Sequence, residues 1–408
     1  MKFCILTQYY KPEMGAPQAR LSELAEFLSN KGFDVTILTS MPNYPTGKIF
    51  EGYGGFMRIE NDGNIKILRT YIYPSKSIRF LPRLWNYFSF TLSSIVSGLY
   101  YLPKCDYIMT ESPPLFLGIS GYILSKFKRA KLIFNVSDLW IESALELGVI
   151  EKGTLFSLSK FLENFIYNNS WRITGQSKEI VHHIDEQIGY KKTFRLSNGV
   201  DTKKYFSTAK NNSLKNWKNN KKYTVLYTGL HGIAQGLDQI IELALMSEIN
   251  NQDVQFILIG DGPEKTTLIK KSQKLKLTNI TFVDPVQREE VPFLMNDADL
   301  AIIPLKKFIP GAVPSKLYEA MALELPVLFI GDGEPADIVK NSHCGVVSKP
   351  DDIESMYNGL KKILSDKSIS QRMGKSGRKS VLKYYNRKEI LNNFEKFLRS
   401  DYPINNHN

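Results

Sequence analysis

Cysteine and histidine are scarce in this chain of 408 residues, which contains three cysteines and five histidines. Cys4, Cys105 and Cys344 are far apart and odd in number, so they form neither a metal-binding spacing nor a disulfide framework. Cys4 and Cys105 also lie in apolar, strand-like runs, where a cysteine behaves as a small hydrophobic residue. The scarcity excludes a disulfide-stapled secreted domain and indicates a reducing compartment.

An export signal is also missing, because the apolar run at residues 3–6 is far shorter than the ~7–15 residues of a signal-peptide core. We therefore expect a cytoplasmic protein. Residues 84–102 carry no charge, but Asn86 and several serines dilute the apolar content that a span of roughly 20 residues needs. Three interpretations stay open for this stretch: a buried amphipathic helix, an interfacial membrane helix and a transmembrane span.

Acidic residues are outnumbered, with 41 Asp and Glu against 53 Lys and Arg and a formal net charge of +12. This excess favours an anionic partner, namely nucleic acid, a phosphate-bearing substrate or an acidic membrane, although solvated lysines produce the same count. No helix-turn-helix, zinc or RNA-binding pattern is present, which makes nucleic acid the poorest of these. Length and ordinary hydrophobic content predict a globular protein of two domains.

Strand-like runs alternate with helical patterns along the chain, which predicts an α/β fold with parallel sheets. Strands are predicted at residues 2–8, 34–39, 107–110, 131–136, 171–175, 224–229, 254–260, 279–283, 300–305 and 326–330. Helices are predicted at residues 20–30, 115–127, 154–169, 178–188, 353–364, 368–385 and 387–398, with only helices beyond residue 345. The Asn- and Lys-rich span 198–222 is interpreted as the linker between two domains. Open α/β sheets bind ligands at the carboxyl ends of their strands, so a crevice shared by both sheets is expected.

Six segments, in their order along the chain, resemble the retaining glycosyltransferases of family 4, which have the two-domain GT-B architecture. They are YYKPEMGAPQAR, SDLWIES, SNGVDTKKYF, LYTGLHGIAQGLD, LIGDGPEK and PSKLYEAMALELPVL. The resemblance is closest to bacterial enzymes of O-antigen, capsule and colanic-acid synthesis, including the L-fucosamine transferase subgroup. It implies two Rossmann-like domains facing a central cleft: an acceptor domain over residues 1–198 and a nucleotide-sugar domain over 199–384. Residues 385–408 are expected to form a helix that returns to the first domain.

The segment PSKLYEAMALELPVL carries the strongest chemical signal. Pro314 precedes a predicted helix with Ser315 as its N-cap, and the free amides of the first turn, including Leu317, suit a phosphate. Lys316 adds a positive charge, and Glu319, one turn on, can accept hydrogen bonds from the two ribose hydroxyls, as it does in the family. The alternative is a plain capped helix whose Lys316 and Glu319 are solvated.

This chain departs from the family pattern near that motif. Many members carry a sugar-contacting glutamate where this chain has Gly311, and an arginine and a lysine that clamp the diphosphate where it has Leu230 and Gln235. We therefore expect Lys316 and Arg288 to supply the missing charge.

Glycines at two strand ends are further candidates for nucleotide contact. Gly229 and Gly260 allow a ligand to approach the backbone, although an ordinary turn also uses glycine. The resemblance implies that the backbone at Val286 pairs with uracil and that Arg288 stacks on the base or contacts phosphate.

In the first domain, Asp138 follows the strand predicted at 131–136 and is the candidate catalytic residue. It can orient or deprotonate the acceptor hydroxyl, or stabilise positive charge on the sugar ring, and its rival role is to cap the next helix. Glu142, one turn on, can share the task. Gly15 and Ala16 leave room for a diphosphate between the first strand and the first helix.

The acceptor is predicted to be a polyprenyl-diphosphate-linked saccharide at an anionic membrane surface, contacted by Arg79, Arg83 and Trp85. No Asp-X-Asp motif occurs in a convincing context, so we expect no metal and no cofactor beyond the UDP-sugar donor. The donor is expected to be a UDP-N-acetyl amino sugar such as UDP-L-FucNAc. The resemblance also implies that transfer retains the configuration at the anomeric carbon of this sugar.

The predicted protein is thus a glycosyltransferase that is peripheral at the inner face of the cytoplasmic membrane. A UDP-sugar epimerase of the same GT-B architecture is the first alternative, but it needs several converging carboxylates and histidines, and this chain shows few. A non-catalytic sugar-binding protein is the second, and the absent signal peptide and the predicted phosphate site argue against it.

Overall fold

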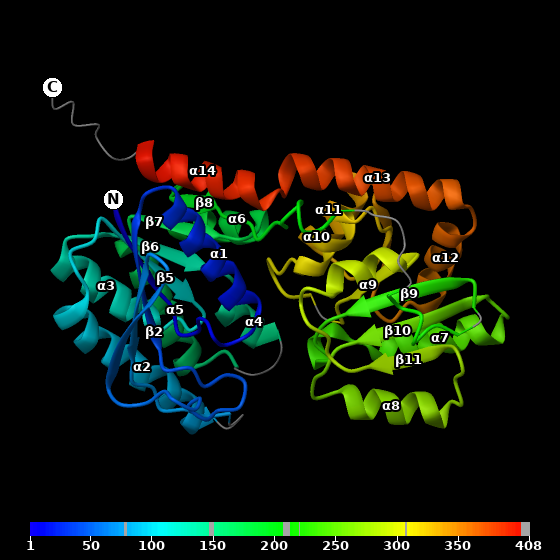
Figure 1. The fold of residues 1–408 in the computed structure, drawn as a ribbon, viewed down its shortest axis with the longest axis horizontal. Coiled ribbons are helices and arrows are strands. Elements are labelled where there is room, and N and C mark those ends of the chain that lie inside the picture. Colours follow the sequence, from blue (N-terminus) through cyan, green and yellow to red (C-terminus); the bar gives the residue numbers. More distant parts are fainter. Residues whose placement is uncertain (77–79, 147–150, 207–212, 220, 307, 401–408) are drawn as a thin grey trace. The chain divides into compact units, whose positions relative to one another are not determined.

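The computed structural model describes residues 1–76, 80–146, 151–206, 213–219, 221–306 and 308–400. The chain divides into two compact units (Figure 1). Unit 1 contains Met1–Ser197 and Leu391–Asn408, and unit 2 contains Asn198–Ile390. Each unit is built around one sheet whose central strands run parallel, as the α/β pattern of the sequence predicts.

The described residues of unit 1 form an eight-stranded sheet in the order β3-β4-β2-β1-β5-β6-β7-β8. The strands are β1 (Lys2–Leu6), β2 (Asp34–Ser40), β3 (Met57–Asp62), β4 (Ile65–Thr70), β5 (Tyr107–Ser112), β6 (Lys131–Val136), β7 (Arg172–Gly175) and β8 (Thr193–Arg195). All neighbours pair in parallel except β3 and β4, which form an antiparallel hairpin. The central strands are buried on both faces, which is why they read as continuous apolar runs.

Helices cover both faces of this sheet. They are α1 (Ala16–Asn30), α2 (Phe80–Tyr101), α3 (Leu117–Lys128), α4 (Trp140–Glu146), α5 (Thr154–Asn169), α6 (Lys178–Ile188) and α14 (Arg387–Ser400). On one face, Cys4 of β1 packs in a core with Phe90 of α2 and Leu124 of α3. On the other face, Phe3 meets Phe394 of α14 with ring centroids 6.4 Å apart. The last helix of the chain thus completes the core of unit 1.

The described residues of unit 2 form a six-stranded, all-parallel sheet in the order β11-β10-β9-β12-β13-β14. The strands are β9 (Tyr223–Thr228), β10 (Val254–Ile259), β11 (Ile280–Val283), β12 (Leu300–Pro304), β13 (Val327–Ile330) and β14 (Gly345–Ser348). The helices are α7 (Asp238–Ile249), α8 (Lys265–Lys274), α9 (Val291–Asp297), α10 (Ser315–Ala322), α11 (Glu334–Ser342), α12 (Ile353–Leu364) and α13 (Lys367–Tyr384), with a 3₁₀ turn η1 (Ile233–Gln235). Two apolar clusters, one on each face of the sheet, form the core.

The predicted α/β fold class is confirmed, and the predicted bounds of β6, α5, α6 and α12 are those of the structure. The prediction of helices alone beyond residue 345 is wrong, because Gly345–Ser348 pairs with β13 as strand β14. Strands β3, β4 and β8 also escaped prediction. Strands β3, β8 and β14 lie at sheet edges, where exposed or half-exposed residues break the apolar run that marks a central strand. Strand β4 is buried, but Lys66 and Arg69 break its apolar run in the sequence.

The uncharged stretch forms most of α2, and its polar residues lie on the buried side. Ser97 and Thr70 of β4 share a hydrogen bond of 2.8 Å between their hydroxyl oxygens, and Ser94 donates to Ser120 of α3 at 3.0 Å. Trp85 instead points outward and is 65% exposed. Across the described ranges, no helix combines the length and apolar content required to cross a membrane.

Candidate functional site

The carboxyl ends of β9 and β10 in unit 2 are held together through two glycines. Gly229 and Gly260 follow these strands with φ angles of 140° and 147°, a region that side-chain-bearing residues rarely adopt. A Cβ atom on Gly260 would lie 1.9 Å from the carbonyl oxygen of Gly229, so no side chain fits between the two strand ends. Gly260 therefore has a packing role that needs no ligand, beside its predicted nucleotide contact.

Helix α10 begins at the same edge of the sheet. Its N-cap is Pro314 rather than the predicted Ser315, which is the first helical residue. Proline has no side-chain acceptor, and the first turn receives no side-chain cap. The amides of Ser315 and Lys316 and the positive end of the helix dipole are therefore available to an anion.

Lys316 lies between this helix start and the end of β9. Its ammonium donates to the hydroxyl of Tyr227 at 3.0 Å and lies 4.1 Å above the centre of the same ring. The Tyr227 hydroxyl in turn donates to the carbonyl of Leu230 at 2.7 Å, which fixes the ring. A Cβ on Gly229 would approach the Lys316 Nζ to 2.7 Å. Burial lowers the pKa of Lys316 to about 8, although the charge of Glu319 acts in the opposite direction.

Glu319 lies one turn further along α10, near several positive charges. Burial raises the pKa of its carboxyl group, and Arg288, Lys316 and Arg387 oppose that rise. Arg288, in the exposed segment after β11, hydrogen-bonds Tyr205, whose own pKa is raised by burial and by the charge of Glu319. The carboxylate and these cations therefore belong to one electrostatic cluster.

Two residues that were predicted to contact the nucleotide pack their side chains against the core of unit 2. Leu317 is fully buried in an apolar cluster, and its amide donates to the carbonyl of Pro314 at 3.0 Å. The structure therefore gives Leu317 a role in helix packing and does not bring it to the site. Val286 is half-buried and packs its side chain against the same cluster, which leaves its backbone as the part that can meet a ligand.

His231 lies beneath this edge and is fully buried. Within the described part of the chain, neither of its ring nitrogens has a hydrogen-bond partner. Burial, together with the charge of Lys265, lowers its pKa to about 4, so the ring is neutral near pH 7. Its backbone is locked to the loop after β10, because its amide donates to the carbonyl of Asp261 at 2.8 Å.

In unit 1, Asp138 follows β6 and is partly buried. Its carboxylate accepts a hydrogen bond from the hydroxyl of Ser143 at 2.8 Å. Burial raises the pKa of Asp138, and the nearby charge of Glu142 adds to the rise. Helix α4 begins two residues later, at Trp140, so Asp138 stands just outside the helix.

Glu142 has a different environment from Asp138. Its carboxylate is bound by the ammonium of Lys160 and lies 3.2 Å from the Nε2 of His183. Burial pushes the pKa of Glu142 upward, but the hydrogen bonds from His183 and Lys160 outweigh it and lower the value to about 2. Of the two carboxylates, Asp138 is therefore the one whose surroundings favour uptake of a proton.

Gly15 ends the exposed loop between β1 and α1 as the N-cap of the helix, and the exposed Ala16 is the first helical residue. The residue at the other side of this loop, Glu13, is buried. Its carboxylate accepts hydrogen bonds from the amides of Asn43 at 2.7 Å and Tyr44 at 2.8 Å. The loop is thus exposed at its tip and anchored at its base.

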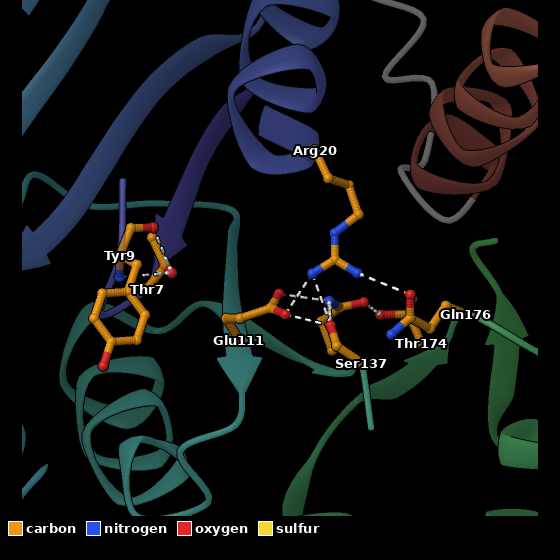
Figure 2. A network of polar contacts seen from close by, with 8 residues as sticks. Thr7, Tyr9, Arg20, Glu111, Ser137, Thr174 and Gln176 are labelled. Atoms are coloured by element: carbon orange, nitrogen blue, oxygen red, sulfur yellow. Dashed lines mark hydrogen bonds and ion pairs between the residues drawn. The ribbon is translucent and has the colours of Figure 1, made fainter. Parts of the chain in front are cut away.

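A network of polar side chains lies beside this loop, at the carboxyl ends of β5, β6 and β7 (Figure 2). Arg20 of α1 donates to Glu111 at 2.5 Å and to the hydroxyl of Ser137 at 2.7 Å. Asn135 donates to Glu111 at 2.6 Å and accepts from Thr174 at 2.5 Å. Figure 2 shows these side chains converging from the helix and from adjacent strands.

Glu111 is absent from the predicted site, although the sequence holds a signal for it. Glu111 and Asn135 are polar residues near the ends of otherwise apolar strands, the positions that face a sheet's ligand-binding edge. Of the residues predicted to meet acceptor or membrane, Trp85 is exposed on α2. Arg79 lies outside the described residues, and the side chain of Arg83 does as well.

Comparison with known proteins identifies the class. Residues 209–380 match the sequence profile of the glycosyl transferases group 1. WcaI of Escherichia coli (strain K12), named for colanic acid biosynthesis as a glycosyl transferase, is 25% identical over 334 residues, which cover 79% of this chain and 81% of WcaI. The N-acetyl-alpha-D-glucosaminyl L-malate synthase of Bacillus anthracis is 21% identical over 390 residues, covering 94% of this chain and 93% of that enzyme.

Solved structures share the fold along nearly the whole chain. Sucrose-phosphate synthase from Thermosynechococcus elongatus superposes with a TM-score of 0.77 at 18% identity, covering 98% of this chain and 99% of that one. HepE from Anabaena in complex with UDP gives 0.74 at 16% identity, with 98% and 100% covered. The chain therefore has the GT-B fold of glycosyltransferases. With the match at residues 209–380 and relatives named as glycosyl transferases, the protein is a glycosyltransferase.

Proposed function

We propose that this glycosyltransferase moves a sugar from a UDP-sugar to a polyprenyl-diphosphate-linked saccharide during synthesis of a bacterial O-antigen or capsule. The observation that carries the donor assignment is the position of Lys316, between the uncapped start of α10 and the glycine that ends β9. WcaI and CapM of Staphylococcus aureus, a relative named for capsular polysaccharide biosynthesis, support the polysaccharide product. HepE, solved with UDP-glucose, supports the donor class.

The donor half of the reaction is assigned to unit 2. The diphosphate binds the first-turn amides of α10 and the ammonium of Lys316, which together balance its charge without a metal. Glu319 accepts hydrogen bonds from the ribose hydroxyls, and Arg288 contacts phosphate or base. The base pairs with the backbone at Val286. The sugar itself is a UDP-N-acetyl amino sugar such as UDP-L-FucNAc.

In the transfer step, the bond between the anomeric carbon and the diphosphate oxygen breaks, and its electron pair leaves with UDP. The acceptor hydroxyl forms the new bond on the same face of the sugar, so configuration is retained. Asp138 accepts the proton of that hydroxyl, a role that its raised pKa suits. Positive charge on the ring is greatest in the transition state, and the same carboxylate stabilises it.

The acceptor half includes a membrane-facing surface made by α2, α3 and α5, which contact one another in that order. Large apolar side chains project from it: Trp85, Leu92 and Tyr100 on α2, and Leu158 and Phe161 on α5, each more than half exposed. Helices α2 and α3 contain no acidic residue, and the one in α5, Glu163, is buried against Lys160. Exposed Lys126 and Arg129 supply positive charge. An apolar, basic surface of this kind fits an anionic bilayer, so we place the enzyme at the inner face of the cytoplasmic membrane.

The reaction is tested by incubating the protein with a panel of UDP-sugars and a synthetic polyprenyl-diphosphate sugar, followed by mass spectrometry. We expect UDP and an acceptor heavier by one sugar. A free UDP-sugar of altered configuration, formed without acceptor, would instead establish the epimerase alternative. Binding of UDP-sugars with no chemical change under any condition would favour a binding protein.

The membrane surface is tested by vesicle flotation at low salt with phosphatidylglycerol-containing vesicles. We expect Phe161→Ser to weaken flotation and Ile249→Ser, which removes an equally exposed apolar side chain from unit 2, to leave it unchanged. Equal flotation of both variants and the wild type would remove this surface from the proposal.

A further inference from the structure

We propose that Arg20 and Glu111 are positioning residues for sugar transfer, holding the start of α1 and the turn that carries Asp138 in one fixed arrangement. The inference rests on the proposed function and assigns a task to residues that do not touch the reactants. It is drawn from the network at the carboxyl edge of the unit 1 sheet (Figure 2).

Glu111 is too buried to meet a substrate directly. Its side chain is 5% exposed, and that of Arg20 is 17% exposed. The carboxylate is occupied by three donors, namely Arg20, Asn135 and the hydroxyl of Ser137. A buried ion pair adds little net stability compared with apolar packing, but removal of one partner leaves an uncompensated charge. Such a pair is therefore better suited to fixing one geometry than to stabilising the fold as a whole.

The two residues join the turn that carries Asp138, the proposed base, to the start of α1. Arg20 lies on α1, four residues after Ala16, so it shares the helix whose exposed start is predicted from the sequence to leave room for a diphosphate. Ser137, which both Arg20 and Glu111 bind, directly precedes Asp138. A shift of the ion pair therefore moves the helix start and the proposed base relative to each other.

The orientation of the network is also fixed from its far end. The hydroxyl of Thr174 donates to Oδ1 of Asn135, which leaves the Nδ2 of that amide to donate to Glu111. Arg20 extends from α1 to the carboxyl edge of the sheet. Its guanidinium donates to the side-chain oxygen of Gln176, the residue after β7, at 3.4 Å. The ends of β5, β6 and β7 are thereby linked to α1 by side chains alone.

The first test is steady-state kinetics of Glu111→Gln, which keeps the shape of the side chain and removes its charge. We expect kcat to fall roughly tenfold to a hundredfold, because small misplacements of reacting groups have effects of that size, while the KM for UDP-sugar stays within about twofold. Ser137→Ala, a milder change that keeps the ion pair, should lower kcat less. Glu26→Gln removes an exposed carboxylate of α1 that pairs with Lys11 and should leave kcat unchanged.

The pH profile separates positioning from catalysis. If Glu111 acts only by positioning, Glu111→Gln retains the acid limb of the kcat profile with a lowered plateau, because Asp138 still titrates. Loss of that limb would mean that Glu111 does more than position Asp138, and it would overturn the proposal. Wild-type kcat in folded Glu111→Gln and Arg20→Lys would also overturn it, since a purely structural pair changes the melting temperature but leaves turnover intact.

Hydrogen exchange keeps the proposal testable even where transfer is not observed. Hydrogen-bonded amides in residues 15–20 and 137–143, such as those of Ala19 and Ser143, should exchange at least about tenfold faster in Glu111→Gln than in the wild type or Glu26→Gln, without any substrate. Faster exchange in a protein that transfers no sugar would support the positioning geometry and refute the proposed function. Unchanged exchange in an active enzyme would refute the positioning role alone.

Discussion

The carboxyl edges of the two sheets differ in how their charged side chains are paired. In unit 1, Arg20 and Glu111 neutralise each other, and Glu142 is bound by Lys160 and His183. In unit 2, the ammonium of Lys316 rests on a neutral phenol, at the start of a helix without a side-chain cap. These charged side chains of unit 1 are paired within the protein, whereas Lys316 of unit 2 presents a positive charge that an anion can pair with.

The pKa directions express the same difference. The pKa of Glu142 is lowered to about 2, which means that its surroundings favour the charged form. The pKa of Lys316 is lowered and that of Glu319 is raised, so burial disfavours the charged form of each. A bound diphosphate would stabilise the charged form of Lys316, and hydrogen bonds from ribose hydroxyls would stabilise the charged form of Glu319. The contrast teaches that the charged groups discussed at the two edges differ in how far the protein itself pairs them.

The largest expected effect concerns the proposed base in unit 1. Asp138→Asn should lower kcat by roughly 10²–10⁴-fold, the usual range for loss of a general base, with little change in UDP affinity. Glu142→Gln, measured at a temperature where both variants are folded, should lower kcat only a few-fold, because that carboxylate is engaged by cations. Equal losses in the two variants would break the distinction between the carboxylates.

The next effect concerns the glycine contact in unit 2. Gly260→Ala should lower the free energy of unfolding by about 3 kcal/mol, because its Cβ would overlap the carbonyl of Gly229 and its φ is positive. Gly189→Ala has the same kind of φ but open space around it, and should lose only about 1 kcal/mol. Urea unfolding followed by fluorescence measures both. Similar losses would mean that the close approach of the strand ends is not rigid.

The smallest effect sharpens the electrostatic contrast. Because the pKa of Lys316 is lowered to about 8, its ammonium is charged below that pH and neutral above it. UDP affinity should therefore fall by up to about tenfold as pH rises through that value, with proton uptake on binding near pH 8. Calorimetry in buffers of different ionisation enthalpy measures both quantities. Lys316→Ala should abolish the pH dependence, and a persistent dependence would assign it to another group.

Sequence patterns predicted the central elements of both sheets because buried parallel strands and amphipathic helices leave strong local signals. The bounds of β6 and α5 needed no tertiary information. The edge strand β14 did need tertiary information, because this short segment, with three half-exposed residues and the buried Ser348, becomes a strand only by pairing with β13. The serines of α2 lowered its apolar content, and only the fold reveals that they face inward.

The candidate site was predictable where one segment holds several groups, as at Pro314, Lys316 and Glu319. It was not predictable where partners are distant in sequence: Arg20 and Glu111 are 91 residues apart. Local sequence also cannot show that Lys316 meets Tyr227, or that Glu142 is bound by Lys160 while Asp138 is not. Those facts depend on strand order.

The central claim is that the start of α10 binds the diphosphate and ribose of the donor, and UDP titration by calorimetry tests it most directly. Lys316→Ala and Glu319→Ala should each weaken UDP binding roughly tenfold to a hundredfold, the usual value of a charge-assisted hydrogen bond. Lys271→Ala, which removes a surface lysine paired with Glu242, should bind UDP like the wild type. Unchanged affinity in both α10 variants, with each folded, would contradict the account.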